Sequence, residues 1–194
     1  MIRDTPAATE AGGLAGVLAA AGVTPAGSRG LPPVHLWHPA HCGDIDIRIA
    51  RDGTWFHNGS PIGRAPLVRL FSTVLRKDPD GYHLVTPAEK LRIRVDDAPF
   101  LATRVDRLGT TLRFLTNVGD EVDAGPDYFI TVEAGAAGEP APYLHVRRGL
   151  MARLTRPVFY ELVDMAETRT TPLGDVLGVE SDGAWFALGA PGAA

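Results

Sequence analysis

The first strongly patterned stretch of the chain is DIDIRIAR at positions 44–51, where three isoleucines alternate with polar or small residues. Strict alternation with a period of two predicts a strand with one buried face. Two turn pairs follow, Asp52-Gly53 and Asn58-Gly59, and they flank the aromatic pair Trp55-Phe56. Turn pairs this close together are typical of tight hairpins. The segment 44–63 is therefore predicted to form a meander of three short strands.

Two later segments show the spacing of an amphipathic helix. In residues 66–75 apolar side chains recur at positions i, i+1, i+3, i+4, i+7 and i+8, and in residues 157–167 they recur at i, i+3, i+4 and i+7. Each segment also begins with a proline, which suits the first turn of a helix because no N–H is needed there. The spacing predicts one helix over each segment.

Residues 91–155 show short apolar runs separated by turn residues, and this pattern predicts a series of strands. One strand at 82–86 precedes them, and two strands at 174–180 and 184–188 follow the second helix. The seven strands predicted in between are residues 91–95, 100–107, 111–116, 121–123, 128–133, 142–147 and 150–155. Such a run favours an antiparallel half-barrel or sandwich. Seven strands closed by one helix also match the outline of a pleckstrin-homology-like domain.

A short internal repeat connects the two halves of the chain. Arg64 and Arg156 each stand where a predicted strand gives way to a helix, three residues before a pair of apolar side chains. The string Asp-Gly-x-Trp-Phe also occurs twice, at 52–56 and at 182–186. We therefore predict an α+β fold that contains two related strand–strand–helix units, one in each half of the chain.

The same patterns suggest three parts of the chain. Residues 1–30 are predicted to be a partly flexible N-terminal segment, with a short alanine-rich helix at 12–21. Residues 31–90 are predicted to form an N-terminal α+β domain. Residues 91–194 are predicted to form the C-terminal, pleckstrin-homology-like domain.

Composition narrows the class of protein. The 194 residues are 45% hydrophobic and 22% charged, which is typical of a globular protein and excludes a disordered chain or a coiled coil. The net charge of −4 argues against a duplex nucleic-acid footprint, which would be basic. The lone cysteine, Cys42, excludes an internal disulfide, and no apolar stretch reaches the ~20 residues of a membrane span. We therefore expect a cytoplasmic protein without a membrane span.

Four potential metal ligands lie close together in the sequence: His35, His38, His41 and Cys42. They could form a zinc site, which would suit a metal-dependent hydrolase. The surrounding prolines instead predict an extended path, on which histidines three residues apart stand about 9 Å from one another, too far for one zinc ion. We therefore expect no metal here and keep the hydrolase as an alternative. Since the chain has no nucleophile elbow, phosphate loop or HExxH motif, no catalytic residue is predicted.

Arg64 and Arg156 are the strongest candidates for contacts with an anion. Each is predicted at the start of a helix, where backbone N–H groups attract anions and a guanidinium can bind a phosphate or carboxylate through two bonds. An ion pair with a neighbouring carboxylate is the structural alternative for both. The basic run from His145 to Arg156 in an acidic protein supports the anion site. The paired carboxylates at 44/46 and 96/97 are interpreted as solvated surface.

The chain resembles a known bacterial family. The strings PPVHLW, CGDIDIRIARDGTWFHNGSPIGR, LVRLFSTVL, LVTPAEK, VDDAPF and PYLHVRRGL…LTRPVFYELV are similar to the family called domain of unknown function 1285, over about residues 31–165. The resemblance implies two domains on a duplicated motif, the second similar to pleckstrin-homology-like folds. It also implies a ligand at the domain interface, with nucleotide derivatives as candidates, and a role in signal transduction. It implies no catalytic residue and no cofactor.

Together these observations favour a non-enzymatic ligand-sensing or signal-transduction module. An anionic, nucleotide-like small molecule is expected at the domain interface, with a protein partner in signalling. The residues predicted to bind the ligand are Arg48, Arg64, Arg147 and Arg156, with Trp37 and His57 nearby. The hydrolase described above and a ligand-independent protein-interaction module are the alternatives.

Overall fold

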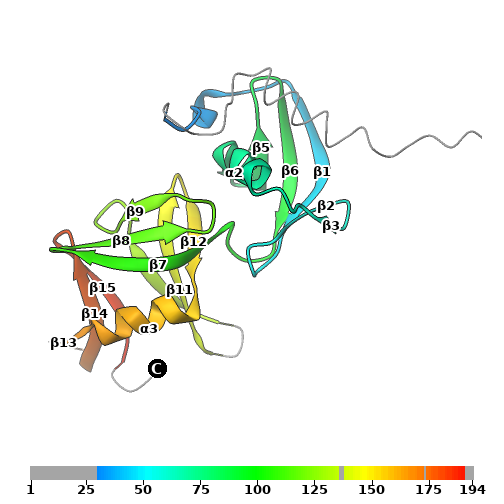
Figure 1. The fold of residues 1–194 in the computed structure, drawn as a ribbon. Coiled ribbons are helices and arrows are strands. Elements are labelled where there is room, and N and C mark those ends of the chain that lie inside the picture. The colour runs from blue at the N-terminus through cyan, green and yellow to red at the C-terminus, as the bar shows by residue number, and fades with distance from the viewer. Residues whose placement is uncertain (1–29, 136–137, 173, 191–194) are drawn as a thin grey trace, which may run out of the picture. The chain divides into compact units, whose positions relative to one another are not determined.

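The structure is a computed structural model that describes residues 30–135, 138–172 and 174–190. The helix expected at 12–21 lies outside the described residues. The chain divides into two compact units. The first unit comprises Met1–Arg48 and Trp55–Arg94, and the second unit comprises Ile49–Thr54 and Val95–Ala194. The protein is therefore a two-domain, mostly-sheet fold with few helices (Figure 1).

The first unit contains a six-stranded sheet with the strand order β3-β2-β1-β6-β5-β4. Its elements are the 3-10 helix η1 (Val34–Leu36), β1 (His41–Ile49), β2 (Trp55–His57), β3 (Ser60–Pro61), α2 (Ala65–Thr73), β4 (Leu75–Asp78), β5 (Gly81–Val85) and β6 (Glu89–Val95). The meander predicted over residues 44–63 is confirmed, because β1, β2 and β3 are neighbours in that order.

The core of the first unit follows from the two periodicities of its sequence. Alternation along β1 buries Ile47, which is 1% exposed. The apolar face of α2 buries Leu70 and Phe71. The Phe71 ring stacks on the buried ring of Trp55 in β2, with 6.2 Å between centroids, so the helix packs directly onto the sheet.

The α2 helix ends two residues earlier than its apolar spacing predicts. The hydroxyl groups of Ser72 and Thr73 donate hydrogen bonds back to the carbonyls of Arg69 and Leu70, at 2.8 and 2.7 Å. Such side-chain bonds compete with the helical backbone bonds and favour a helix end. Leu75 then begins β4, a strand that the sequence pattern did not predict.

The second unit contains a six-stranded sheet and a three-stranded sheet. The larger sheet has the order β10-β11-β12-β7-β8-β9 and forms a half-barrel, and the smaller one has the order β13-β14-β15. The elements are β7 (Phe100–Leu108), β8 (Thr111–Thr116), β9 (Glu121–Asp123), β10 (Ile130–Ala134), β11 (Pro140–Arg147), β12 (Leu150–Leu154), α3 (Arg156–Asp164), β13 (Glu167–Thr171), β14 (Gly174–Ser181) and β15 (Ala184–Gly189). The α3 helix packs against β7 and β14 (Figure 1). Strand β10 packs against β15.

The half-barrel differs in two ways from the predicted run of seven antiparallel strands. The first predicted strand, now β6, pairs with β5 in the sheet of the first unit. The remaining six strands form two antiparallel meanders, β7-β8-β9 and β10-β11-β12. They join through one parallel pair, in which Ala152 of β12 lies opposite Phe100 of β7. After α3, the polar segment ETRTT forms the strand β13, whereas the spacing extended the helix to Glu167.

Candidate functional site

Two prolines open a cavity in the second unit. The N–H of His145 in β11 donates to the carbonyl of Phe129, just before β10, at 2.9 Å. Along a strand, the backbone N–H and C=O groups of successive residues point alternately to its two neighbouring strands. His145 points to β10, so Pro140 and Pro142 point to β12. A proline has no N–H to donate, and pairing of β11 with β12 accordingly starts only at Tyr143. A cavity of about 640 Å³ lies at this gap, between β7, β11, β12 and the first turn of α3.

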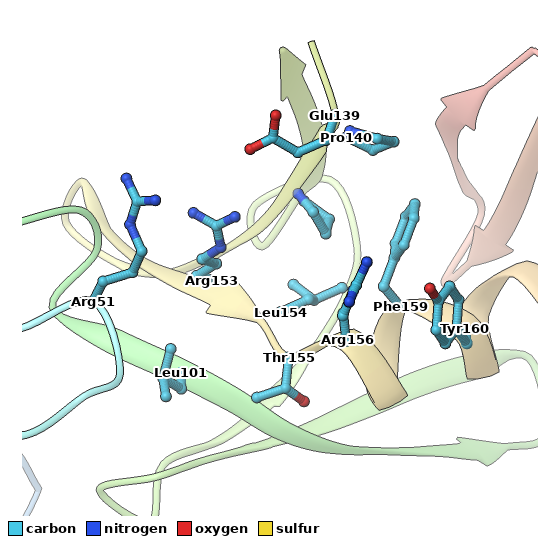
Figure 2. Close-up of a pocket in the computed structure, with 11 residues that line it drawn as sticks. Arg51, Leu101, Glu139, Pro140, Arg153, Leu154, Thr155, Arg156, Phe159 and Tyr160 are labelled. Atoms are coloured by element: carbon cyan, nitrogen blue, oxygen red, sulfur yellow. The ribbon is translucent and has the colours of Figure 1, made fainter. Parts of the chain in front are cut away.

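The cavity combines apolar and charged side chains. Its apolar lining consists of Leu101, Pro140, Pro142, Leu154, Phe159 and the ring of Tyr160. Its polar lining consists of Arg51, Glu139, Arg153, Thr155 and Arg156. In Figure 2 the side chains of Arg51 and Arg153 stand close to each other, whereas Arg156 lies beside Phe159. Apolar walls with a few placed polar groups are typical of small-molecule sites.

Two of the cavity arginines are held by a carboxylate that lies behind them. The Asp97 side chain is only 11% exposed and forms an ion pair with Arg153. It also accepts a hydrogen bond of 2.7 Å from the hydroxyl of Tyr143, and the Nε of Arg51 lies 3.6 Å away. The Arg153 guanidinium in addition lies over the Tyr143 ring, 5.9 Å from its centroid. Arg153 is therefore fixed from two sides.

This network determines which of its groups carry charge. Burial would raise the pKa of Asp97, but hydrogen bonds from Tyr143 and Arg153, with the nearby arginine charges, hold that pKa below its usual value. Burial and the bond to Asp97 raise the pKa of Tyr143 to about 12. At neutral pH one carboxylate charge therefore faces the two positive charges of Arg51 and Arg153, and the tyrosine stays neutral.

Arg156 is the third cavity arginine and stands outside this network. It is exposed and is the first residue of α3. Among the described residues, none forms a hydrogen bond or ion pair with its side chain. The N-cap residue Thr155 makes no side-chain capping bond, so the first turn of the helix also keeps backbone N–H groups for another partner. Both features favour an anion at this end of the cavity.

The other residues predicted to bind the ligand lie elsewhere. Arg147 forms an ion pair with Asp120 and lies over the Phe100 ring, 4.8 Å from its centroid, and it does not line the cavity. Arg64 is in the first unit, where it is the exposed N-cap of α2. It thus precedes its helix, whereas Arg156 is already part of α3.

The remaining predicted contacts also belong to the first unit. Arg48 on β1 lies over the ring of Phe56, 5.8 Å from its centroid. His57 is half-buried on β2. Trp37 follows η1, and its carbonyl accepts a hydrogen bond of 2.9 Å from Arg76. Of the six predicted residues, Arg156 is the one that lines the cavity of the second unit.

Sequence reasoning missed most of the residues that line this cavity or support it. Arg153 belongs to the basic run between His145 and Arg156, but its partner Asp97 is 56 positions away, in a carboxylate pair that the sequence pattern assigns to solvated surface. Tyr143 carried no signal of its own. A usable signal was the Pro-x-Pro pair at 140 and 142, where the strand predicted at 142–147 begins, because prolines in a sheet mark an edge or a gap.

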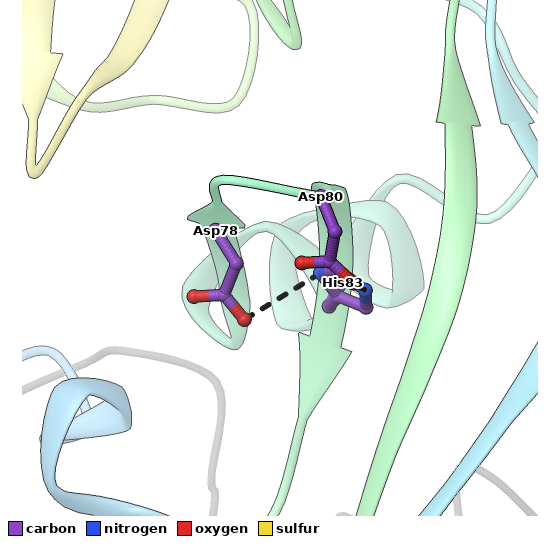
Figure 3. Close-up of side chains that lie close together, drawn as sticks. All are labelled: Asp78, Asp80 and His83. Atoms are coloured by element: carbon purple, nitrogen blue, oxygen red, sulfur yellow. Dashed lines mark ion pairs between the residues drawn. The ribbon is translucent and has the colours of Figure 1, made fainter.

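A second cluster of charges lies in the first unit and has the donor types of a metal site. Donor atoms of Asp78, Asp80 and His83 all lie within 4.8 Å of one another (Figure 3). However, the Nζ of Lys90 lies 2.7 Å from the Asp78 carboxylate and 3.7 Å from that of Asp80. Arg76 adds a second cation at 2.9 Å from Asp78. The chain's own cations thus occupy the place that a metal ion would take.

The histidine–cysteine segment gives no ligand set in the part of the chain that is described. His35 is in η1, and the exposed His38 and Cys42 lie before and at the start of β1. These three do not belong to any described group whose donor atoms lie within 4.8 Å of one another. The side chain of His41 lies outside the described residues.

Comparison with known proteins places the chain in a family. The family description "Domain of unknown function (DUF1285), N-terminal domain" matches residues 32–98, and "Protein of unknown function (DUF1285), C-terminal domain" matches residues 99–188. No curated protein matches the chain.

Two solved structures are similar. A DUF1285 family protein from Silicibacter pomeroyi DSS-3 is 47% identical with a TM-score of 0.80, over 90% of this chain and 95% of that one. A DUF1285 family protein from Shewanella baltica OS155 is 28% identical with a TM-score of 0.50, over 61% of this chain and 90% of that one. The two family matches together span most of the chain, which therefore belongs to the DUF1285 family.

Proposed function

We propose that this protein is a non-enzymatic ligand-sensing or signal-transduction module that binds an anionic small molecule in the cavity of the second unit. The observation that carries this proposal is Arg156, an arginine without a described partner beside a largely apolar cavity of about 640 Å³. A cation that has no partner among the described residues is available to a ligand. The nucleotide derivatives implied by the family resemblance are one candidate class, and the position of the ligand between the domains stays a prediction.

The chemistry of the lining supports binding rather than catalysis. The lining residues include no histidine, cysteine or serine, and Glu139 is their one carboxylic acid. Acid–base or nucleophilic catalysis needs a reactive group with a base or acid within hydrogen-bond reach. The hydroxyl groups of Thr155 and Tyr160 have no histidine beside them in this lining.

The test compares the two arginines at the helix starts. Inorganic phosphate and AMP are titrated into wild-type protein and into Arg156→Lys and Arg64→Lys, with binding measured by calorimetry and folding by thermal melting. Lysine keeps the charge but loses the two-bond geometry, so Arg156→Lys should weaken binding about tenfold at an unchanged melting temperature. Arg107→Gln, an exposed arginine on β7, serves as the control. Unchanged affinity together with a lower melting temperature would make Arg156 a structural residue instead.

A protein-interaction module is the second candidate. The half-barrel followed by α3 supports the pleckstrin-homology-like comparison, which we keep as a proposal. The exposed rings of Tyr128 and Phe129 both stack on His145, with centroids 6.1 and 5.1 Å apart, and form a rigid aromatic surface. Capture of one partner from a cell lysate that is lost in Tyr128→Ala and persists in Arg156→Gln would favour this function over ligand binding.

The cytoplasmic location also stays a prediction. None of the described helices is both long and apolar enough to cross a bilayer.

A further inference from the structure

A second cavity, of about 240 Å³, adjoins the first within the second unit. The two cavities share three lining residues, Glu139, Pro140 and Phe159. Besides the shared Pro140 and Phe159, and Ala190 after β15, the apolar side chains of the second cavity come from β10, α3, β14 and β15. They are Val132, Ala134, Val163, Leu177 and Leu188. Its charged lining residues, Glu133 and Glu139, are both acidic, so this cavity offers an anion no attraction.

We propose that the two cavities form one site for a straight-chain carboxylate. The carboxylate group binds at Arg156, and the chain passes Phe159 into the second cavity. This inference rests on the proposed function, because it assigns a ligand class to the same anion site.

The charge of the first cavity favours a ligand with a single negative charge. Arg51, Arg153 and Arg156 carry three positive charges, and Asp97 and Glu139 carry two negative ones, which leaves a surplus of one positive charge. A monocarboxylate neutralises this surplus. A nucleoside triphosphate would instead bring several negative charges next to the two carboxylates that the site already holds.

The residues that line the two cavities favour an acyl chain over a nucleotide base. A base is recognised by hydrogen bonds to its edges. In the first cavity Arg51 and Arg153 already face Asp97, and Arg156 would hold the anionic group. Glu139, Thr155 and the hydroxyl of Tyr160 are the polar lining groups left to bind a base. The second cavity has no side-chain hydroxyl or amide among its lining residues. Burying methylene groups against Val163, Leu177 and Leu188 would therefore supply most of the affinity.

Phe159 stands at the junction of the two cavities and is 8% exposed. A chain that ends before this ring contacts only the first cavity. A longer chain gains contacts in the second one, so affinity should depend on chain length. Burial of each further methylene is worth about a fourfold change in the dissociation constant.

The experiment measures the dissociation constants of hexanoate, octanoate and decanoate by calorimetry, with octanol and AMP as comparison compounds. In wild-type protein each step of two methylenes should tighten binding about 15-fold. Arg156→Gln should weaken the three carboxylates about tenfold and leave octanol unchanged. Arg107→Gln, on an exposed part of β7, should change none of them.

Two further variants fill the second cavity from different elements. Val163→Phe on α3 and Leu177→Phe on β14 replace half-buried side chains with larger ones. Each should leave hexanoate affinity unchanged and remove the gain between octanoate and decanoate. Since the two positions are on separate elements, failure of one variant to fold leaves the other as the test.

The outcomes separate this inference from the proposed function. Equal affinity for all three carboxylates, or a chain-length gain that survives both filling variants, overturns the inference. Binding of AMP that depends on Arg156, with no binding of any carboxylate, also overturns it and leaves the proposed function standing. No binding of phosphate, AMP or carboxylate overturns both.

Discussion

Each unit contains a partly buried carboxylate surrounded by cations. The two charge networks, around Asp78 and around Asp97, differ in whether every cation beside them is paired with a carboxylate. In the first unit, Asp78 is bonded by Lys90 at 2.7 Å and by Arg76 at 2.9 Å, and the Nδ1 of His83 lies 3.7 Å away. In the second unit, Asp97 is bonded by Tyr143 and Arg153. In the first network, which we call the closed network, cations of the protein itself pair with the carboxylates. The second, which we call the open network, lies beside a cavity that a further arginine lines.

The difference traces to the strands that carry the two networks. The partners of Asp78 come from the neighbouring strands β4, β5 and β6, where regular pairing brings opposite charges together. Around Asp97 the pairing of β11 with β12 stops at the prolines, and Arg156 at the start of α3 is left outside the network. A cluster of charges alone therefore does not indicate a ligand site. Our proposal of a ligand site rests instead on Arg156, a cation without a partner among the described residues, next to a largely apolar cavity.

The largest expected effect comes from removing the carboxylate of the open network. Asp97→Ala leaves Arg153 without its ion pair and Tyr143 without its acceptor, so the free energy of unfolding should fall by roughly 3 kcal/mol. Urea denaturation followed by circular dichroism measures this. Asp106→Ala, which breaks an exposed pair with Arg104, is the matched control and should change stability far less. Equal losses in both variants would show that the Asp97 network is ordinary surface.

The closed network should depend on Lys90. Its side chain is 20% exposed and lies between two carboxylates, so Lys90→Met keeps the apolar stem and removes the charge that holds Asp78. We expect a loss of about 1.5 kcal/mol in urea denaturation. Lys77→Met is the control, because Lys77 is exposed and lies over the Tyr82 ring, 5.5 Å from its centroid. An unchanged stability in Lys90→Met would mean that the network is not closed by this residue.

Sequence patterns predicted the elements well where one periodicity governs a segment. The alternation in β1 and the apolar spacing in α2 and α3 gave strands and helices within a few residues of their observed bounds. The polar strands β4 and β13 were missed, because sheet pairing stabilises them and their own sequences have no apolar alternation. Family resemblance supplied the division into two domains.

Similar strings need not place equivalent side chains in the core. The string Asp-Gly-x-Trp-Phe occurs in two hairpins. The first has the three-residue loop 51–53 and buries Trp55, which is 1% exposed. The second has the two-residue loop 182–183 and buries Phe186, which is 6% exposed. In the second hairpin Trp185 lies opposite the exposed Glu180, whereas Phe186 lies opposite the buried Val179 and therefore faces the core.

The candidate site was less predictable than the fold. Arg156 was predicted because a helix start can be read locally from Arg-Pro followed by an apolar spacing. Asp97, Tyr143 and Arg153 meet only through pairings between positions 46 and 56 residues apart. The direction in which Pro142 faces depends on the register of β11, which the sequence of that strand does not determine by itself.

A smaller effect is expected from the hydroxyl that bonds to Asp97. Tyr143→Phe removes one hydrogen bond to a charged acceptor and keeps the ring under Arg153, so the free energy of unfolding should fall by about 1 kcal/mol. The loss of stability in acid should also begin at a higher pH, because Asp97 loses a hydrogen-bond donor that lowers its pKa. Urea denaturation between pH 7 and 3 checks both. Tyr160→Phe is the control at an exposed tyrosine.

The smallest expected effect is a difference between the two units in how their stability depends on pH. Burial, reinforced by the charge of Lys90, holds the pKa of His83 below its ordinary value of 6.5, so the unfolded chain takes up a proton that the folded first unit does not. Stability of the first unit should therefore fall as pH drops from 7 to 5. The pKa of Asp97 is held below 3.8, so its contribution to the second unit persists until the pH falls below about 4.

Hydrogen exchange read by mass spectrometry, corrected for the intrinsic pH dependence of exchange, reports on both units in one sample. Between pH 7 and 5, protection of β4 and β5 should decrease relative to that of β7 and β8. In His83→Gln, which cannot titrate, that decrease should disappear. A parallel loss of protection in both units, or a loss that persists in His83→Gln, would show that this histidine does not distinguish the closed network from the open one.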